Sequence, residues 1–336
     1  MGDKIKVGII GAGRIGKIHT SNIIKNFQNI EVKAVADIYA NNIQEWAASL
    51  GITKVYSDYK KIIEDPEINA VIICSSTDTH SQITIEAAQA GKHIFCEKPI
   101  DYDIDRIHAA LAAVKKAGVK FQVGFNRRFD HNFKKVREII QSGEIGDIQI
   151  VKVVSRDPSP PPIEYVKVSG GMFLDMTIHD FDMVRYLTGS EVTEVFANAG
   201  VLVDKAIGEA DDVDTALISL KFKNGAIGMI DNCRQAVYGY DQRVEVLGTK
   251  GGISVANDTP TTVVVSTENA VLNDKPKYFF LERYMESFEA EMKDFFYSIA
   301  NDTETVVSGL DGLKPVLIGI AAQKSYKERR PIRLEE

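Results

Sequence analysis

The segment that decides the fold is residues 4–16, which read KIKVGIIGAGRIG. Its first part, Lys4–Ile10, is short and rich in β-branched residues, as expected of a buried strand. The strand leads directly into a G-x-G-x-x-G motif at residues 11–16, and a helical pattern follows. The motif alone is weak evidence, but its position between a strand and a helix is typical of a dinucleotide-binding βαβ unit.

Each glycine of this motif has an expected physical role. We expect Gly11 to permit the tight turn, Gly13 to let a pyrophosphate approach the backbone, and Gly16 to allow close packing of the helix on the strand. The N-terminus of the following helix offers unpaired N–H groups to the phosphates. The loop is therefore predicted to hold the pyrophosphate of a dinucleotide.

An acidic residue at the end of the second strand indicates which dinucleotide is bound. The predicted strand Val32–Ala36 ends at Asp37, and 37 − 16 = 21 residues separate this acid from the last glycine of the motif. A carboxylate at this spacing typically hydrogen-bonds the adenine ribose hydroxyls. The alternative is that Asp37 is only a turn residue at the end of a strand. It would repel a 2′-phosphate, and residues 38–40, Ile-Tyr-Ala, offer no Arg or Lys to hold one. The sequence therefore predicts NAD rather than NADP.

Apolar runs alternate with helical patterns over the first 125 residues or so. Buried strands that alternate with helices indicate a parallel sheet covered on both faces. The predicted strands are residues 4–10, 32–36, 70–74, 93–96 and 120–123, and two of the predicted helices are 79–90 and 104–117. The first part of the chain is therefore expected to be a doubly wound parallel sheet of the Rossmann type.

The pattern changes near Gly124, where we place a domain boundary. A large, mostly antiparallel open sheet is predicted from alternating segments at 148–154, 192–203, 214–222, 226–232 and 243–247. Further helices are expected around residues 172–187, 284–300 and 308–328. The prediction is an α/β protein of two domains: an NAD-binding Rossmann domain at 1–124, and a C-terminal substrate-binding and oligomerisation domain at 125–336.

Composition narrows the classes of function. The 336 residues carry a formal net charge of -7, which argues against nucleic acid or an anionic membrane as the main partner. No apolar stretch reaches the roughly 18 residues that a membrane span needs. The three cysteines, Cys74, Cys96 and Cys233, lie far apart, which favours reduced thiols over a disulfide frame or a zinc cluster. We expect a cytoplasmic protein.

Two segments carry candidate catalytic residues. The tripeptide EKP at residues 97–99 follows the strand 93–96, and the carboxyl ends of parallel strands form the ligand crevice, so we expect Lys98 to face the nicotinamide. Asp175 and His179 are four residues apart, so on one helix they would share a face. A carboxylate that orients an imidazole makes a general base, although a mutually satisfied surface pair has the same spacing.

The second segment also raises the possibility of a metal site, because Asp175, His179 and Asp182 fall at positions i, i+4 and i+7. Three mixed ligands from one helix, without a second cluster, make a weak case for zinc. We therefore expect no metal.

In combination, these motifs resemble the glucose–fructose oxidoreductase/inositol dehydrogenase family, often called Gfo/Idh/MocA, over essentially the whole chain. The resemblance depends on the glycine motif, Thr79-His80, residues 97–99, and Gly170-Gly171 leading to Asp175 and His179. Four further segments are similar to the inositol 2-dehydrogenase branch: residues 126–130, 155–158, 175–182 and 235–242.

The resemblance implies an activity and a set of roles. It implies an NAD-dependent enzyme that oxidises a ring hydroxyl of a cyclic polyol, with myo-inositol as the expected substrate and 2-keto-myo-inositol (scyllo-inosose) as the product. Lys98 would hydrogen-bond the reacting oxygen and stabilise the developing alkoxide. His179 would take the hydroxyl proton, and Asp175 would orient it. The C-terminal sheet would pack subunits into dimers or tetramers.

The residues expected to contact ligands form two sets. Those expected to bind NAD are Gly11, Gly13, Arg14, Ile15, Gly16, Asp37, Ser75, Thr77, His80, Glu97 and Lys98. A ring of hydroxyls needs several donors and acceptors. Those expected to bind the polyol are Lys98, Asn126, Arg127, Asp157, Asp175, His179 and Tyr238. The resemblance also suggests a cis peptide bond between Lys98 and Pro99.

Two different functions are compatible with the same fold. A dehydrogenase of another inositol isomer or of a hexose, or a reductase of another small carbonyl compound, would use it, since sites rather than folds set function. A non-catalytic NAD(H)-binding redox sensor would also use it. Such a sensor would not require the catalytic lysine or histidine, whereas this chain has both Lys98 and His179.

Overall fold

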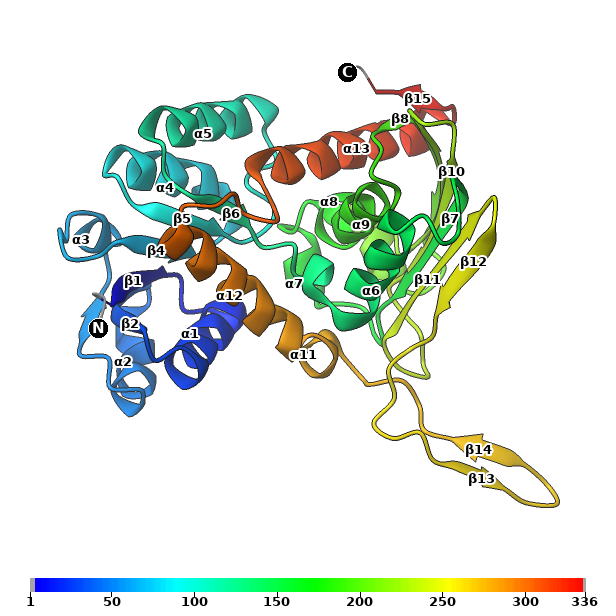
Figure 1. Ribbon diagram of the computed structural model, residues 1–336, viewed down its shortest axis with the longest axis horizontal. Helices are drawn as coiled ribbons and strands as arrows, with labels where there is room; N and C mark the ends of the chain where they lie inside the picture. The colour runs from blue at the N-terminus through cyan, green and yellow to red at the C-terminus, as the bar shows by residue number, and fades with distance from the viewer. Residues whose placement is uncertain (1–3, 335–336) are drawn as a thin grey trace. The chain divides into compact units, whose positions relative to one another are not determined.

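The computed structural model describes residues 4–334, which divide into two compact units (Figure 1). Unit 1 runs to Asn126 and takes in Glu286–Lys314, and unit 2 comprises Arg127–Met285 and the chain from Pro315 onward. The sequence predicts a single boundary between residues 124 and 125, whereas the structure returns 286–314 to the first unit. The reason is packing, because apolar side chains of this later segment lie in the hydrophobic core of unit 1.

Unit 1 contains a six-stranded parallel sheet in the order β3-β2-β1-β4-β5-β6. Its strands are β1 (Ile5–Ile10), β2 (Ile30–Ala36), β3 (Lys54–Tyr56), β4 (Ala70–Ile73), β5 (His93–Cys96) and β6 (Phe121–Val123). The prediction of a Rossmann-type sheet is confirmed, although β3 was missed because three residues are too few to show a period. The strand order reverses direction between β1 and β4, and in open parallel sheets ligands bind at the carboxyl ends of the strands at such a point.

Helices cover both faces of this sheet. One face receives α1 (Arg14–Asn26), α2 (Ala40–Ser49) and α12 (Met285–Asn301), whose apolar side chains form one core cluster with alternate residues of the strands. Side chains alternate across a strand, so the intervening residues face the opposite layer. That layer holds α3 (Lys60–Ile63), α4 (Thr77–Gln89) and α5 (Ile104–Ala117), and Figure 1 shows α4 and α5 side by side.

Unit 2 contains a seven-stranded sheet in the order β12-β11-β7-β10-β9-β8-β15. Its strands are β7 (Ile148–Arg156), β8 (Val192–Gly200), β9 (Thr215–Phe222), β10 (Ile227–Cys233), β11 (Asp241–Gly248), β12 (Gly251–Val255) and β15 (Ile332–Arg333). Neighbouring strands are antiparallel except for β7 and β10, which confirms the mostly antiparallel sheet. Buried and exposed residues alternate along β9, β10 and β11, so one face of the sheet is covered and the other is open.

The remaining elements of unit 2 are helices and one hairpin. The helices are η1 (Asn126–Phe129), α6 (His131–Gln141), α7 (Ile163–Val166), α8 (Gly171–Asp175), α9 (Ile178–Thr188), α10 (Lys205–Glu209), α11 (Phe280–Arg283) and α13 (Gly309–Glu328). Two of them cross the unit boundary: η1 begins at the last residue of the first segment of unit 1, and the first turns of α13 belong to unit 1. The hairpin pairs β13 (Val264–Ser266) with β14 (Val271–Asn273). Helix α9 packs on β7, which places the Asp175–His179 region over the covered face of the sheet.

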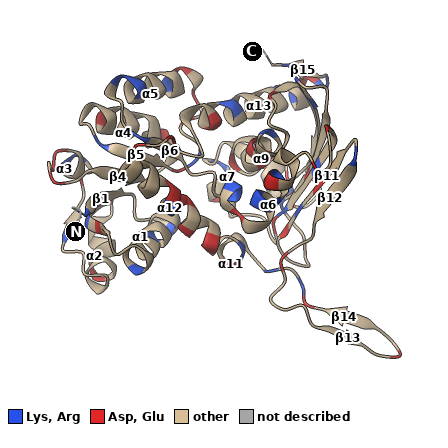
Figure 2. Cartoon of the chain, in the orientation of Figure 1, with Lys and Arg blue, Asp and Glu red and all other residues tan. Residues whose placement is uncertain are grey.

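Charged residues are distributed over both units (Figure 2). Acidic and basic residues are interspersed along the described elements of both units, as Figure 2 shows, and the formal net charge is -7. Among the helices formed by residues 4–334, none combines the length and apolar character that crossing a bilayer requires.

Candidate active site and cofactor site

The glycine loop has the geometry that a bound pyrophosphate requires. Gly11 has φ +93°, and a Cβ atom there would lie 2.5 Å from the backbone nitrogen of Ser75. A Cβ atom at Gly16 would collide with the carbonyl oxygen of Gly11. At Gly13, by contrast, a Cβ atom would find nothing within 4 Å. The first and third glycines are therefore required by packing, and the second leaves open space for the phosphates at the start of α1.

Asp37 lies beside this loop at the end of β2. Its Oδ2 accepts a hydrogen bond of 2.8 Å from the backbone N–H of Ala12, and its Oδ1 accepts one of 2.8 Å from the N–H of Tyr39. The side chain is partly buried, so its outer edge remains open to a ligand. These contacts fit an acid that receives the ribose hydroxyls of a dinucleotide.

The segment after β4 brings three predicted cofactor residues together. Ser75 and Thr79 have their hydroxyl oxygens 2.7 Å apart, and Thr77 is the first residue of α4. His80 is buried, with Nδ1 2.8 Å from the carbonyl oxygen of Pro99 and Nε2 3.0 Å from that of Ser75. Its ring therefore joins the loops after β4 and β5. Arg14, at the start of α1, is exposed, and Ile15 is partly buried.

The EKP tripeptide follows β5, as predicted. The N–H of Glu97 continues the parallel ladder by donating to the carbonyl of Ile73 at 2.9 Å. The predicted cis peptide bond between Lys98 and Pro99 is confirmed. Lys98 is partly buried, and its backbone N–H donates to Oε2 of Glu97 at 3.3 Å. The lysine thus lies at the carboxyl end of the sheet, in the unit that carries the glycine loop.

Asp175 and His179 do not lie on one continuous helix, and the predicted helix over 172–187 is wrong in this respect. Helix α8 ends at Asp175 and α9 begins at Ile178. Between them, the N–H of Thr177 bonds back to the carbonyl of Met172 at 2.9 Å, and the Thr177 hydroxyl donates to Oδ1 of Asn232 at 2.6 Å. The bond across to β10 holds the chain in a turn, so the two residues flank a helix break.

Arg234 is a site residue that the sequence did not reveal. It is only 2% exposed, and its guanidinium lies 3.4 Å from Oδ2 of Asp175 and 3.8 Å from Oδ2 of Asp212. The Tyr165 hydroxyl donates to the other oxygen of Asp175 at 2.8 Å. Asp175 is therefore held by Tyr165, 10 residues before it, and by Arg234, 59 residues after it, and no local spacing could have indicated Arg234.

Asp157 belongs to the same electrostatic cluster. Its backbone is fixed to the neighbouring strand end, because its N–H donates to the carbonyl of Cys233 at 2.9 Å. Burial raises the pKa of the Asp157 carboxyl to about 6, assisted by the negative charge of Asp175 and opposed by the cation of Arg234. Asp157 therefore titrates close to neutral pH, as acid–base and hydrogen-bonding groups of active sites often do.

The structure places Arg127 in a buried network. Its Nη1 donates to Oδ1 of Asp180 at 2.6 Å and to the Ser155 hydroxyl at 3.3 Å, and the residue is 5% exposed. Asn232 donates to the other oxygen of Asp180 at 2.8 Å. Burial raises the pKa of Asp180, and the Arg127 cation opposes that rise. The Arg127 side chain thus has protein partners of its own.

The other residues singled out from the sequence, Tyr238, Asn126 and Asp182, each lie in a different local environment. Tyr238 is 39% exposed; its hydroxyl accepts from Arg156 at 3.1 Å and donates to Asp241 at 2.6 Å. Asn126 is buried at the start of η1. Asp182, the third member of the possible metal triad, forms a two-pronged ion pair with Arg128 at 2.6 and 2.9 Å.

Comparisons with known proteins identify relatives over the whole chain. The family described as "Oxidoreductase family, NAD-binding Rossmann fold" matches residues 5–125, and the GFO/IDH/MocA C-terminal domain matches residues 133–254. The myo-inositol 2-dehydrogenase of Thermotoga maritima is 49% identical, with 99% of each chain covered. The inositol 2-dehydrogenase of Rhizobium meliloti is 43% identical, with 98% of each chain covered.

A solved structure extends the similarity to three dimensions. The scyllo-inositol dehydrogenase of Lactobacillus casei, with bound cofactor NAD(H) and scyllo-inositol, superposes with a TM-score of 0.92 at 30% identity. The match covers 98% of this chain and 99% of that one. The chain therefore belongs to the GFO/IDH/MocA family of oxidoreductases, which have an NAD-binding Rossmann fold.

Proposed function

We propose that this oxidoreductase uses NAD to oxidise one ring hydroxyl of a cyclic polyol, with myo-inositol as substrate and 2-keto-myo-inositol as product. The observation that carries the proposal is full-length similarity to two inositol 2-dehydrogenases, at 49% and 43% identity. The chain also has, at Lys98, Asp175 and His179, the residue types that alcohol oxidation needs.

The proposed catalytic roles follow from the chemistry of each group. Oxidation of an alcohol releases a proton, and the neutral imidazole of His179 is suited to accept it near pH 7. Asp175 orients that imidazole and is itself held by Tyr165 and Arg234. Lys98 donates to the reacting oxygen and stabilises the alkoxide as it forms. NAD, when bound, supplies the hydride acceptor.

We further propose that other side chains of the site recognise the remaining hydroxyls. Asp157 can accept hydrogen bonds when it is ionised, and Tyr238 and Asn126 can both donate and accept. Arg127 supports the site without contacting the polyol directly, because its guanidinium already donates to Ser155 and Asp180. Discrimination between polyols would then depend on whether each buried donor or acceptor finds a hydroxyl partner.

A second candidate is oxidation of another inositol isomer. The specific observation in its favour is the similarity to the Lactobacillus casei enzyme whose structure holds scyllo-inositol, at 30% identity over 98% of this chain. The isomers differ in which hydroxyl groups are axial, so the same catalytic set could act on either. The fold would equally serve a hexose dehydrogenase or an NAD(H)-binding sensor without turnover.

We also propose that the chain forms a homo-oligomer through the open face of the unit 2 sheet. Ile227 on β10 and Leu247 on β11 are 51% and 44% exposed, and both pair with Ile150 of β7, so the three form an apolar row. A contiguous apolar row on an open sheet face is typical of a subunit interface. Replacing Leu247 with Glu should lower the mass measured by light scattering if this face is the interface, and should leave it unchanged otherwise.

We propose a cytoplasmic location as well. Cys74, Cys96 and Cys233 are free thiols in the described structure, as is usual in a reducing compartment. Fractionation of the source cells followed by immunoblotting would test this.

A substrate panel tests the proposed function. Purified enzyme and NAD would be mixed with myo-, scyllo- and D-chiro-inositol and with glucose, and NADH formation would be followed by absorbance. The proposal predicts the highest kcat/KM for myo-inositol. Preference for scyllo-inositol would support the second candidate. Binding of NAD without turnover of any polyol would contradict the proposal and favour a sensor.

A further inference from the structure

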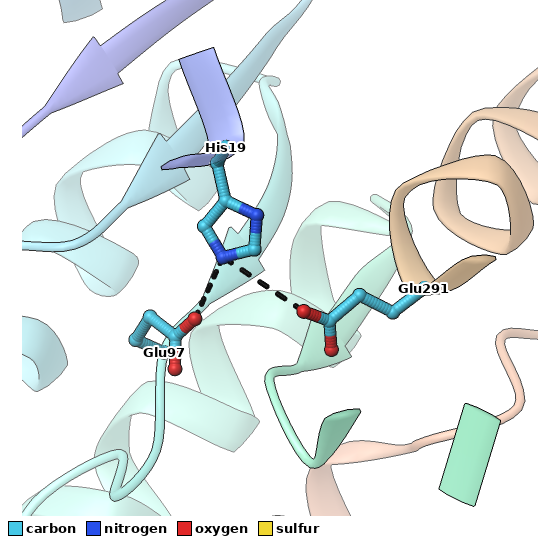
Figure 3. A group of neighbouring side chains, drawn as sticks. All are labelled: His19, Glu97 and Glu291. Carbon is cyan, nitrogen blue, oxygen red and sulfur yellow. Dashed lines mark hydrogen bonds and ion pairs between the residues drawn. The ribbon is translucent and has the colours of Figure 1, made fainter. Parts of the chain in front are cut away.

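Unit 1 contains a buried group of three titratable side chains, which we call the acid cluster: His19, Glu97 and Glu291. They come from α1, from the end of β5 and from α12, and Figure 3 shows the two carboxylates converging on the imidazole. Nε2 of His19 lies 2.7 Å from Oε1 of Glu97 and 3.8 Å from Oε1 of Glu291. The side chains of His19 and Glu291 are fully buried, and that of Glu97 is 13% exposed.

The surroundings of His19 indicate where its proton lies. The ring packs edge-on against Phe95 and Phe288, with centroid distances of 5.2 and 5.7 Å. Within residues 4–334, its Nδ1 has no hydrogen-bond partner. A proton on Nδ1 would be a buried donor without an acceptor, which costs free energy. The neutral ring with its proton on Nε2 avoids this, and that proton is donated to Glu97.

Glu291 cannot be paired in the same way. Across the part of the chain that the structure describes, neither of its carboxyl oxygens has a hydrogen-bond partner. A second carboxylate charge beside Glu97, without a donor or a cation, would be very unfavourable in a buried site. Burial raises the pKa of Glu291 well above its usual range, and the charge of Glu97 raises it further.

A metal ion explains the cluster less well. His19, Glu97 and Glu291 each offer a ligand atom, and these atoms lie within 4.8 Å of one another. Two ligand atoms of one tetrahedral zinc lie about 3.3 Å apart, since each bond is about 2.0 Å long. The 2.7 Å between His19 and Glu97 is instead a hydrogen-bond distance. A ligating histidine also normally donates through its other nitrogen, and Nδ1 has no acceptor among residues 4–334.

We propose that Glu291 is a neutral carboxylic acid and that, with His19, it is a positioning residue for Glu97 and thereby for Lys98. This inference rests on the proposed function in so far as Lys98 acts in the reaction. Oε1 of Glu97 is held by His19, and Oε2 accepts the backbone N–H of Lys98 at 3.3 Å. The same carboxylate lies over Gly124, where a Cβ atom would come within 2.8 Å of Oε2.

The protonation state of Glu291 decides whether this arrangement holds. While Glu291 is neutral, the Nε2 proton of His19 has one charged acceptor, Glu97. If Glu291 ionised, two carboxylates would compete for that proton and Glu97 would be held less firmly. Two thiols, Cys74 after β4 and Cys96 on β5, also lie near the cluster, and burial raises the pKa of both. The cluster thus has one carboxylate charge, on Glu97.

The first experiment measures thermal stability at several pH values and requires no catalytic activity. Glu291→Gln mimics the neutral acid, and Glu286→Gln is the control, because Glu286 is an exposed acid on the same helix. A group whose pKa is higher in the folded state than in the unfolded state stabilises the fold. This contribution is complete at pH values below the unfolded-state pKa and is lost as the pH rises toward the folded-state pKa. The Tm of Glu291→Gln relative to wild type should therefore increase from about pH 5 to pH 8. The control should show no such trend.

Infrared spectroscopy gives a direct signature of the same group. The difference spectrum of wild-type protein minus Glu291→Gln at neutral pH should show the carbonyl stretch of a protonated carboxylic acid, since other carboxyls with a raised pKa, such as Asp157, contribute to both proteins. The band should persist in Glu286→Gln. A relative Tm that is flat or falls with pH, or the absence of the acid band, would show that Glu291 is ionised and would overturn the proposal.

Kinetics test the positioning role. Glu291→Gln should keep kcat near the wild-type value, whereas Glu291→Ala should lose kcat while NAD binding and the folded circular dichroism spectrum are retained. Equal loss in both variants would contradict a neutral acid. Stoichiometric zinc or iron in the purified enzyme, removed by a chelator together with activity, would replace the proposal with a metal site. If no polyol is oxidised but the Tm trend and infrared band appear, only the proposed function fails.

Discussion

The backbone N–H of Ala12 donates a 2.8 Å hydrogen bond to Oδ2 of Asp37, which ties the acid at the end of β2 to the glycine loop. The other oxygen of Asp37 accepts the N–H of Tyr39. The carboxylate is therefore fixed in the loop before any cofactor arrives, and a fixed group loses little conformational entropy on binding.

Replacing Asp37 with Ala should weaken NAD binding and reduce the preference for NAD over NADP, because the ribose hydroxyls lose their acceptor and a 2′-phosphate loses its repulsion. Calorimetric titration with both cofactors measures the change. Glu31→Gln, at an exposed acid near the start of β2, is the matched control and should bind as wild type does. Unchanged affinity for both cofactors in Asp37→Ala would mean that this acid is only a turn residue.

Alanine at two glycines of the loop should have opposite effects. Gly13→Ala should fold with unchanged stability, since a Cβ there meets nothing within 4 Å, yet lose NAD affinity because the methyl group occupies phosphate space. Gly16→Ala should be destabilised, because its Cβ collides with the carbonyl oxygen of Gly11. Thermal unfolding and NAD titration of both variants separate the two roles. Normal NAD affinity in Gly13→Ala would contradict the cofactor site.

The sequence could predict those parts of the site whose residues are close together in the chain. The glycine loop and the acid that follows β2 form local patterns, and Lys98 lies next to a strand end that its apolar neighbours reveal. The acid cluster was not predicted, because Glu291 comes from a segment that rejoins unit 1 after the long first segment of unit 2, Arg127–Met285. Arg234 was missed because 59 residues separate it from Asp175 in the chain. The break between α8 and α9 depends on Thr177 bonding to a distant strand, so the helical spacing of the sequence could not show it.

Asp157 should give the reaction a pH dependence. Burial raises its pKa to about 6, so its ionised form, which we propose accepts hydrogen bonds from a polyol, increases as pH rises through that value. The kcat/KM for myo-inositol should rise over this range in wild type, and Asp157→Asn should lack that step. Wild-type stability should also fall relative to Asp157→Asn from about pH 4 to 6, by an amount of the order of 2–3 kcal/mol. Identical pH profiles for both proteins would remove Asp157 from the site.

The buried pair of Arg127 and Asp180 should make a large contribution to the stability of unit 2. Arg127→Met leaves the Asp180 carboxylate buried without its cation, and breaking such a pair lowers the free energy of unfolding by about 3–5 kcal/mol. The double variant Arg127→Met/Asp180→Asn should recover much of that loss, since no charge is left unpaired. Urea unfolding of the three proteins measures both effects. A single variant as stable as wild type would show that the pair is not needed for the fold.

The most direct test of the account is the kinetics of His179→Ala with myo-inositol and NAD. If His179 is the general base, kcat should fall by roughly 10²–10⁴-fold, while the Kd for NAD stays near the wild-type value because the glycine loop and Asp37 are untouched. Lys98→Ala should give a similar loss, and the double variant should lose less than the product of the two. Near-normal oxidation of myo-inositol by His179→Ala would contradict the proposed mechanism.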